Sequence, residues 1–272
     1  MSSTHPWQEL GDRVYTRRYA FYDQQIGLVL GDGAALVIDT RTMPSHAREI
    51  VGDARLITPW PISIVVNTHA HGDHCFGNSV FAGAQLWGQR GAVRFLAETG
   101  VQTVKELTAE LPDLAADLAQ VEFVPPTHLV DARGIVEVGG RAVQLAFHGR
   151  GHTNHDLVVT IPDVGVTFAG DLVEEGAAPY FGDGYPLDWP GTLDAVLASL
   201  AHGPVVPGHG AVGDRAFVER SRHELQAVVA AAQRVRAGEP IDEVTRDVPY
   251  APEPAREAVE RALAQIEGRL DR

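Results

Sequence analysis

Residues 68 to 74 read THAHGDH, and they follow the apolar run ISIVV at 62 to 66 after a single intervening asparagine. The β-branched run predicts a buried strand. Three histidines and one aspartate therefore stand within seven positions at the end of that strand. Polar groups crowded beside a core need matching partners, and the rest of the chain must supply them.

The spacing inside this stretch favours metal binding. His69 and His71 are two positions apart, so their side chains point the same way on an extended backbone. Asp73 is two positions further along, in the same spacing, whereas His74 follows it directly and does not fit that spacing. One ion can therefore bind His69 and His71, while the offset pair Asp73 and His74 can bind a second ion nearby. Two ions need further ligands from elsewhere in the chain.

Three later positions are candidates for these missing ligands. His152 stands between a glycine and a threonine, Asp171 follows the apolar run VTFAG, and His209 lies between two glycines after PVVP. A glycine beside a ligand lets the backbone approach an ion closely. Taken singly, each histidine could be exposed or packed in the core, and Asp171 could cap a helix. Their glycine contexts at strand ends favour ligation.

The remaining pattern predicts strands and helices in both halves of the chain. Pro44 opens a helical stretch between two strands, which indicates a βαβ unit with THAHGDH at the carboxyl end of its second strand. Helical spacing covers 90 to 120 with an interruption at Pro112, and the tail from about 214 is mostly helical, divided at Gly238 and Pro240. The expected strands are 13–21, 25–30, 34–40, 62–66, 128–130, 135–140, 142–147, 156–161 and 165–171. Strands followed by helices in each half suggest two sheets with helices outside.

The order of these motifs resembles that of the metallo-β-lactamase superfamily. The shared features are His-x-His-x-Asp-His, Gly-His-Thr, Gly-Asp and Pro-Gly-His-Gly, preceded by VIDT at 37 to 40 with its aspartate Asp39. The resemblance runs from about residue 14 to 211. It implies an α/β fold, a four-layer αββα sandwich whose site lies between the sheets. The expected organisation is a single domain over 1–272, with a helical C-terminal extension over about 212–272.

The resemblance also implies roles for individual residues. The first ion would bind His69, His71 and His152, and Asp171 would bridge both ions. The second would bind Asp73, His74 and His209. Asp39 would support the metal loop from behind. The cofactors implied are two Zn²⁺, although the donor types also suit iron or manganese. A hydroxide shared by the ions would attack the substrate, and Asp73 would orient it.

The identity of residue 171 bears on the substrate. Members of the superfamily that destroy β-lactams have Cys or Ser at the position that matches Asp171, whereas glyoxalase II, lactonases and phosphodiesterases have a bridging aspartate. The expected activity is hydrolysis of a small ester, thioester or lactone. Three alternatives stay open: a mononuclear iron persulfide dioxygenase that uses His69, His152 and Asp171, a weak β-lactamase, and a non-catalytic metal-binding protein.

Other residues near the motifs have less definite roles. The loop at 178 to 190 is rich in Pro, Gly and aromatics. Its aromatic side chains either form a wall of the substrate pocket or cap the sheet edge; they are Tyr180, Phe181 and Tyr185. His148 and His155 are expected to line the cleft or support the ligands, and Cys75 to be a buried thiol.

Charge and composition exclude several classes of partner. The 272 residues carry 22 basic and 36 acidic side chains, a formal net charge of -14, which disfavours nucleic acid and membrane surfaces. A single cysteine permits no intrachain disulfide. The N-terminus lacks the pattern of a signal peptide, so a cytoplasmic protein is expected. The expected partner is a small-molecule substrate, and homo-oligomerisation is left open.

Overall fold

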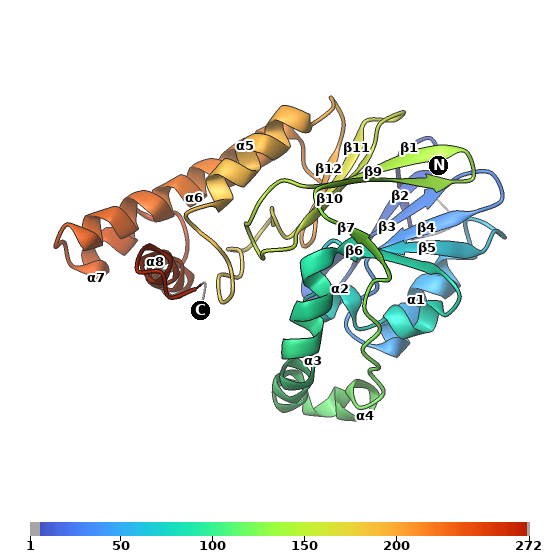
Figure 1. The fold of residues 1–272 in the computed structure, drawn as a ribbon, viewed down its shortest axis with the longest axis horizontal. Helices are drawn as coiled ribbons and strands as arrows, with labels where there is room; N and C mark the ends of the chain where they lie inside the picture. The colour runs from blue at the N-terminus through green and yellow to red at the C-terminus, as the bar shows by residue number, and fades with distance from the viewer. Residues whose placement is uncertain (1–5, 271–272) are drawn as a thin grey trace.

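The computed structural model describes residues 6–270, and it contains two β-sheets (Figure 1). The first sheet has seven strands in sequence order. They are β1 (Gln8–Gly11), β2 (Val14–Tyr19), β3 (Gln24–Leu30), β4 (Ala35–Ile38), β5 (Ile62–Val66), β6 (Gln85–Gln89) and β7 (His128–Val130). Strands β1 to β4 are antiparallel, whereas β4 to β7 run parallel. Helix α1 (Pro44–Ala54) connects β4 to the parallel β5, so the predicted βαβ unit is confirmed.

The second sheet has five strands in the order β12-β11-β10-β9-β8. They are β8 (Arg133–Val138), β9 (Arg141–Phe147), β10 (Leu157–Ile161), β11 (Val166–Gly170) and β12 (Val205–Pro207). Only the β11–β12 pair is parallel, because a helix, α5 (Trp189–Ser199), lies between these strands in the chain. The parallel pair places the ends of β11 and β12 at the same edge of the sheet.

Helices cover the outer face of each sheet (Figure 1). The remaining helices are α2 (Gly72–Cys75), α3 (Arg90–Glu110), α4 (Ala115–Leu118), α6 (Arg215–Arg236), α7 (Ile241–Val244) and α8 (Pro252–Ile266). Buried residues of α1 pack on the outer face of the first sheet. Those of α5 and α6 belong to the apolar cluster that covers the outer face of the second, and α8 packs on α6. The architecture is therefore the four-layer αββα sandwich that the sequence analysis expects, with helices at its C-terminal end.

Alternation of side chains along the strands builds three apolar layers. In β4, Leu36 and Ile38 face the space between the sheets, while Ala35 and Val37 face α1. In β10, Leu157, Val159 and Ile161 belong to the inner layer and Val158 to the layer under α5. Successive side chains of a strand point to opposite faces, so a strand covered on both sides is apolar throughout.

The element boundaries follow the sequence pattern closely, but strands β1 and β6 and helix α5 were not expected. Helix α3 ends at Glu110 just before Pro112, and α6 ends at Arg236 before Gly238. Helix α5 had no counterpart in the sequence analysis. It begins with Trp189 and Pro190 and is buried along much of its length, so its sequence lacks the polar face that marks a surface helix.

Over the described part of the chain, no helix is both long enough and apolar enough to cross a bilayer.

We expect Phe168 to be a main contributor to the stability of the inner layer. It is 3% exposed on β11, and its ring lies against Gly27 of the opposite sheet, where an added Cβ would approach to 2.7 Å. Phe168→Ala should lower the free energy of unfolding by about 3–5 kcal/mol, because the change leaves a cavity between the sheets. Ile135→Ala, at a side chain that is 66% exposed, is the control and should change it by less than about 0.5 kcal/mol. Urea denaturation measures both; equal effects would show that Phe168 does not join the sheets.

Candidate metal centre

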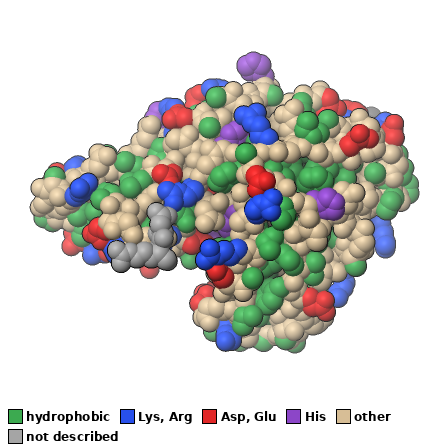
Figure 2. All heavy atoms as spheres, viewed as in Figure 1, with side chains coloured by type: hydrophobic (Ala, Val, Ile, Leu, Met, Phe, Trp, Pro, Cys, Tyr) green, Lys and Arg blue, Asp and Glu red, His purple; other side chains and the backbone are tan. Residues whose placement is uncertain are grey.

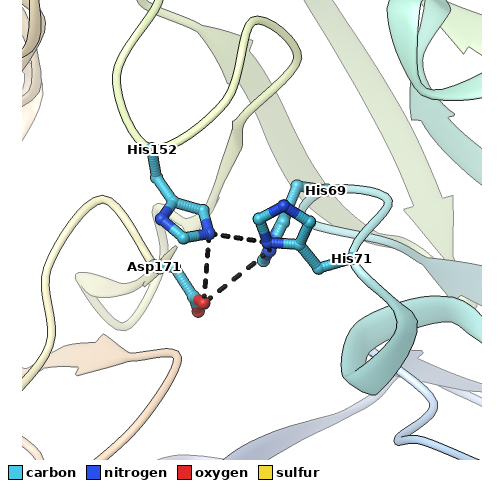
Figure 3. Close-up of side chains that lie close together, drawn as sticks. All are labelled: His69, His71, His152 and Asp171. Carbon is cyan, nitrogen blue, oxygen red and sulfur yellow. Dashed lines mark hydrogen bonds and ion pairs between the residues drawn. The ribbon is translucent and has the colours of Figure 1, made fainter. Parts of the chain in front are cut away.

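Three imidazoles meet where the loop after β5 faces the loop between β9 and β10 (Figure 3). The Nδ1 atom of His71 lies 3.1 Å from Nε2 of His69 and 2.8 Å from Nε2 of His152. His69 and His152 are each 1% exposed. Ligand nitrogens about 2.0–2.1 Å from a tetrahedral zinc ion are about 3.3 Å apart, so the three nitrogens are close to that spacing.

A second group of donors lies on α2 and after β12. Nε2 of His74 is 3.3 Å from Nε2 of His209. The Oδ2 atom of Asp73 lies 3.3 Å from the first of these nitrogens and 3.2 Å from the second. The donor atoms of these three residues lie within 4.8 Å of one another, a spacing that can hold an ion.

Asp171 lies between the two groups. Its Oδ2 is 3.4 Å from Nε2 of His152 and 3.7 Å from Nε2 of His69, and Figure 3 shows the carboxylate facing these rings. The same carboxylate lies 3.2 Å from Nε2 of His74 and 3.3 Å from Nε2 of His209. The structure therefore brings together all seven residues that the sequence analysis singled out as ligands.

The close approach of β11 and β12 depends on glycine. Gly208 follows β12 directly, and a Cβ atom there would lie 1.7 Å from Oδ1 of Asp171. Any side chain at this position would displace the carboxylate. The glycine before His209 thus allows the ends of the two parallel strands to place Asp171 and His209 side by side.

Asp39 supports the loop after β5, as the resemblance implies. Its carboxylate accepts hydrogen bonds from the amide of Thr68 at 2.7 Å and from the Thr68 hydroxyl at 2.8 Å. It also contacts Nδ1 of His74 at 2.8 Å. Because Nδ1 is bound to Asp39, the Nε2 atom of His74 faces the second group of donors. A carboxylate behind a histidine fixes its ring orientation in metal sites.

Burial and charge set the protonation of the individual histidines differently, and the Asp183 carboxylate raises the pKa of His71 although burial opposes this. Burial lowers the pKa of His152 to about 4 and that of His69 well below its usual range, so both rings are neutral at pH 7 with lone pairs available. Burial also opposes protonation of His209, but the Asp171 and Asp73 carboxylates outweigh it and raise its pKa to about 12. The two carboxylates thus create a negative potential that attracts positive charge.

Asp183 is a site residue that the sequence analysis missed. Its Oδ2 lies 2.9 Å from Nε2 of His71, the ring nitrogen that faces away from the three converging imidazole nitrogens. Burial opposes its ionisation, but the His71 imidazole outweighs this effect and lowers the pKa of Asp183 to about 2. The sequence feature that could have indicated it is an aspartate between two glycines in the loop at 178 to 190. Only the aromatic residues of that loop were candidates for the site.

The loop that carries His152 has its own internal support. The buried carboxylate of Asp156 accepts hydrogen bonds from the Thr153 amide at 2.8 Å and the Thr153 hydroxyl at 2.6 Å. Nε2 of His155 accepts a hydrogen bond from the amide of Ala70 at 3.2 Å, which ties this loop to the loop after β5. His155 therefore supports the site from behind.

His148 and Cys75 lie outside both groups of donors. The only contact described for the His148 side chain is with the hydroxyl of Ser199 at 3.5 Å, so the structure does not show it supporting the ligands. Cys75 is 2% exposed, its thiol donates to the carbonyl of Ala70 at 3.4 Å, and burial raises its pKa. The expected buried thiol is confirmed.

A cavity of about 1010 Å³ opens beside the donors, between α3 and the segment 174–183. The predicted ligands that line it are His71, Asp73, His152, Asp171 and His209. Figure 2 shows the surface notched between the C-terminal helices and the part formed by α3 and α4. A small molecule of moderate size can therefore reach the ligand atoms.

Of the three aromatic residues expected in the pocket wall, only Tyr180 lines the cavity. Phe181 is fully buried and packs against Trp189 and Tyr250, with ring centroids 5.7 Å apart in each pair. Tyr185 is 9% exposed, and its ring is covered by the guanidinium of Arg150 at 4.5 Å. The expectation of a pocket wall is wrong for these two residues, because Phe181 packs in the core under α5 and Tyr185 packs against Arg150.

The sandwich fold and the two adjoining groups of donors are those of a metal-dependent hydrolase. A family model described as the Metallo-beta-lactamase superfamily matches residues 21–209, well over half of the chain. The chain belongs to the metallo-β-lactamase superfamily.

Similar proteins agree with this assignment. The chain is 24% identical over 238 residues to a type 2 metallo-beta-lactamase of Bacteroides fragilis, covering 83% of this chain and 87% of that protein. It is 26% identical over 198 residues to one of Bacillus cereus, covering 71% and 69%. A solved metallo-beta-lactamase from Pontibacter korlensis has a TM-score of 0.67 at 20% identity, covering 81% of this chain and 98% of that chain. The DIM-1 metallo-beta-lactamase has a TM-score of 0.64 at 18% identity, covering 81% and 96%, and these two structures show the fold alone.

We expect Asp183 to fix the ring of His71 in metal-loaded protein. Asp183→Asn should weaken metal binding by about 10–100-fold, because the amide is a weaker acceptor for the His71 ring. Competition with a chelating dye measures this affinity. The exposed Asp194 on α5, which pairs with Arg222, provides the control variant Asp194→Asn. Unchanged affinity in Asp183→Asn would contradict the positioning role.

Proposed function

We propose that this chain is a dinuclear zinc hydrolase that cleaves a small ester, thioester or lactone. The observation that carries the proposal is the position of Asp171, whose carboxylate lies within 3.7 Å of four imidazoles that belong to two groups of donors. A carboxylate shared in this way suits a bridge between two ions. Membership of the superfamily supports hydrolysis as the reaction.

The donor set fits two zinc ions. One ion would be held by His69, His71 and His152, the other by Asp73, His74 and His209, with Asp171 between them. Imidazole and carboxylate ligands suit zinc, and also iron or manganese. When bound, such ions supply a water of lowered pKa as nucleophile and polarise the substrate carbonyl.

The chain's own residues position the reactants. Asp73 lines the cavity, and its carboxylate lies against His74 and His209, so it can orient water and hold the proton that water gives up. The positions of His74 and His71 are in turn fixed by Asp39 and Asp183. No side-chain nucleophile is needed in this scheme.

The substrate class rests on Asp171 and on the size of the cavity. An aspartate at this position supports an activity like that of the glyoxalase II and lactonase-like branch, whereas the β-lactam-destroying branch has Cys or Ser there. The relatives named above are metallo-beta-lactamases, which makes a β-lactam the second candidate substrate. The two candidates differ in the bond cleaved, an ester-type bond against a strained amide.

The first experiment measures metal content and hydrolysis together. Protein purified without added metal should contain two zinc ions per chain and hydrolyse at least one member of a panel of ester, thioester, lactone and β-lactam substrates. Removal of metal by a chelator should abolish turnover, and zinc should restore it, because the donors alone supply no nucleophile. One iron per chain with oxygen uptake would instead support the persulfide dioxygenase. Full metal loading without turnover on any member would support a non-catalytic protein.

Replacement of a ligand tests the assignment directly. His209→Ala should lower bound zinc from two ions to one and lower kcat by at least about 100-fold, because it removes a donor of the second group. His202→Ala is the matched control, since His202 is an exposed histidine outside both groups of donors. Metal analysis and steady-state kinetics provide the measurements. Two ions retained in His209→Ala would refute this ligand set.

A further inference from the structure

One wall of the cavity is a single face of helix α3. The lining positions Phe95, Thr99, Thr103, Glu106 and Glu110 recur every three or four residues, as expected for one side of a helix. The acidic and basic side chains of this helix are separated with respect to the cavity. All three of its acidic side chains line the cavity, namely Glu98, Glu106 and Glu110. None of its three basic side chains does, namely Arg90, Arg94 and Lys105.

Two of these glutamates carry charge that is not cancelled nearby. Glu98 pairs with Arg94 at 2.7 Å, but over residues 6–270 no ion pair is found for Glu106 or Glu110. Glu106 accepts a hydrogen bond from the side-chain amide of Gln102 at 2.8 Å, a neutral partner that adds no positive charge. Both carboxylates therefore present uncompensated charge to the cavity.

The opposite wall adds more acidic groups and one basic group. Its carboxylates beyond the predicted ligands are Asp23, Glu174, Glu175 and Asp183. Burial raises the pKa of Glu174 to about 8, so this side chain adds little negative charge to the wall at pH 7. Among the described residues that line the cavity, the one Lys or Arg is Arg18, and its guanidinium is paired with Asp23. Among the described residues of the lining, no unpaired Lys or Arg is therefore present to bind an anion.

Aromatic rings stand between these carboxylates. Tyr180 is 55% exposed and Tyr22 is 39% exposed, which is unusual for rings of this size, and Phe95 also lines the cavity. Burial raises the pKa of Tyr180, and the charges of Asp183, Glu257 and Glu106 raise it further, whereas Arg261 lowers it. Burial and the charges of Asp73 and Glu110 raise the pKa of Tyr22. Carboxylates combined with accessible aromatic faces are the surroundings that bind organic cations.

We propose that the substrate carries a positively charged group, an ammonium or quaternary ammonium, at the end remote from the bond that is cleaved. This inference rests on the proposed hydrolase function, and it names the substrate class of the same site. The cationic end binds beside Glu106 and Glu110 of α3. The ring of Tyr180, whose centroid lies 6.0 Å from that of His71, is close to the donor atoms and contacts the part of the substrate nearer to them. The reacting carbonyl lies at the other end of the cavity, beside His71, Asp73 and His209.

The charge of the bound ions does not remove this preference. Asp73 and Asp171 do not add to the negative charge of the cavity wall, because the ions that they would hold would neutralise them. The excess positive charge of a loaded centre acts on the reacting end of the substrate. The remote end faces Glu106 and Glu110 instead, so an anionic group there would be repelled.

The experiment compares three aryl esters of equal length that end in trimethylammonium, tert-butyl or carboxylate. The first two have nearly the same shape, so their ratio reports charge alone. With zinc-loaded protein, kcat/KM should be at least about tenfold higher for the cationic ester than for its neutral isostere, and lowest for the anionic one. The advantage should shrink as salt is raised from 0.05 to about 0.5 M, because salt screens the carboxylates.

Variants locate the preference on α3. The double change Glu106→Gln and Glu110→Gln should reduce the ratio of cationic to neutral kcat/KM by about three- to tenfold, mainly through KM of the cationic ester. The control Glu122→Gln removes an exposed carboxylate outside the cavity lining and should leave the ratio as it is. An unchanged ratio in the double variant, or an equal or greater rate on the neutral or anionic ester in the wild-type protein, would overturn the proposal.

Failure of the hydrolase function would be distinguishable from failure of this inference. If the zinc-loaded protein hydrolyses none of the three esters, the function proposed above fails for esters. The corresponding ethers, which cannot be hydrolysed, then decide the inference by calorimetry. The cationic ether should bind at least about tenfold more tightly than the neutral one, and equal affinities would refute a cation-binding wall.

Discussion

The structure depends on the crowding of five imidazoles and two carboxylates into one buried place between two sheets. His69, His74, His152 and Asp171 are each at most 5% exposed. Polar groups removed from water are costly unless each finds a partner. Here the donor atoms face one another at 2.8 to 3.7 Å. They share too few protons to satisfy every lone pair, so the arrangement suits a cation better than it suits a hydrogen-bond network.

The topology explains how such crowding arises. The ligands come from the ends of β5, β11 and β12 and from the loop between β9 and β10, all of which reach the same side of the sandwich. No single segment could provide seven donors around two points. The two sheets must therefore pack before the site exists, and the inner layer around Phe168 supports the geometry of the metal centre. Gly208 leaves the space that Asp171 needs between the two strand ends. Asp39 anchors the loop after β5 by accepting a hydrogen bond from Thr68.

Short-range patterns made much of this predictable. Histidines two apart after a buried run, a glycine beside each later candidate and the order of these motifs predicted the seven residues that the structure brings together. Asp183 escaped notice because its partner His71 is 112 positions away and no spacing links them. For Phe181 the sequence left a pocket wall and a cap of the sheet edge both open, and in the structure its ring packs in the core under α5. Helix α5 itself gave no amphipathic signal, since most of its residues are buried.

The net charge of -14 acquires a more specific meaning from the cavity. As a bulk number it argues only against polyanionic partners. In the structure, part of that charge is gathered on one face of α3, while the basic residues of the helix point elsewhere. A cavity lined by one sign of charge focuses the electric field and raises the local concentration of oppositely charged molecules. The same acidity that repels a phosphate backbone therefore favours the approach of a small cation, and it does so at the entrance to the donor atoms rather than uniformly over the surface.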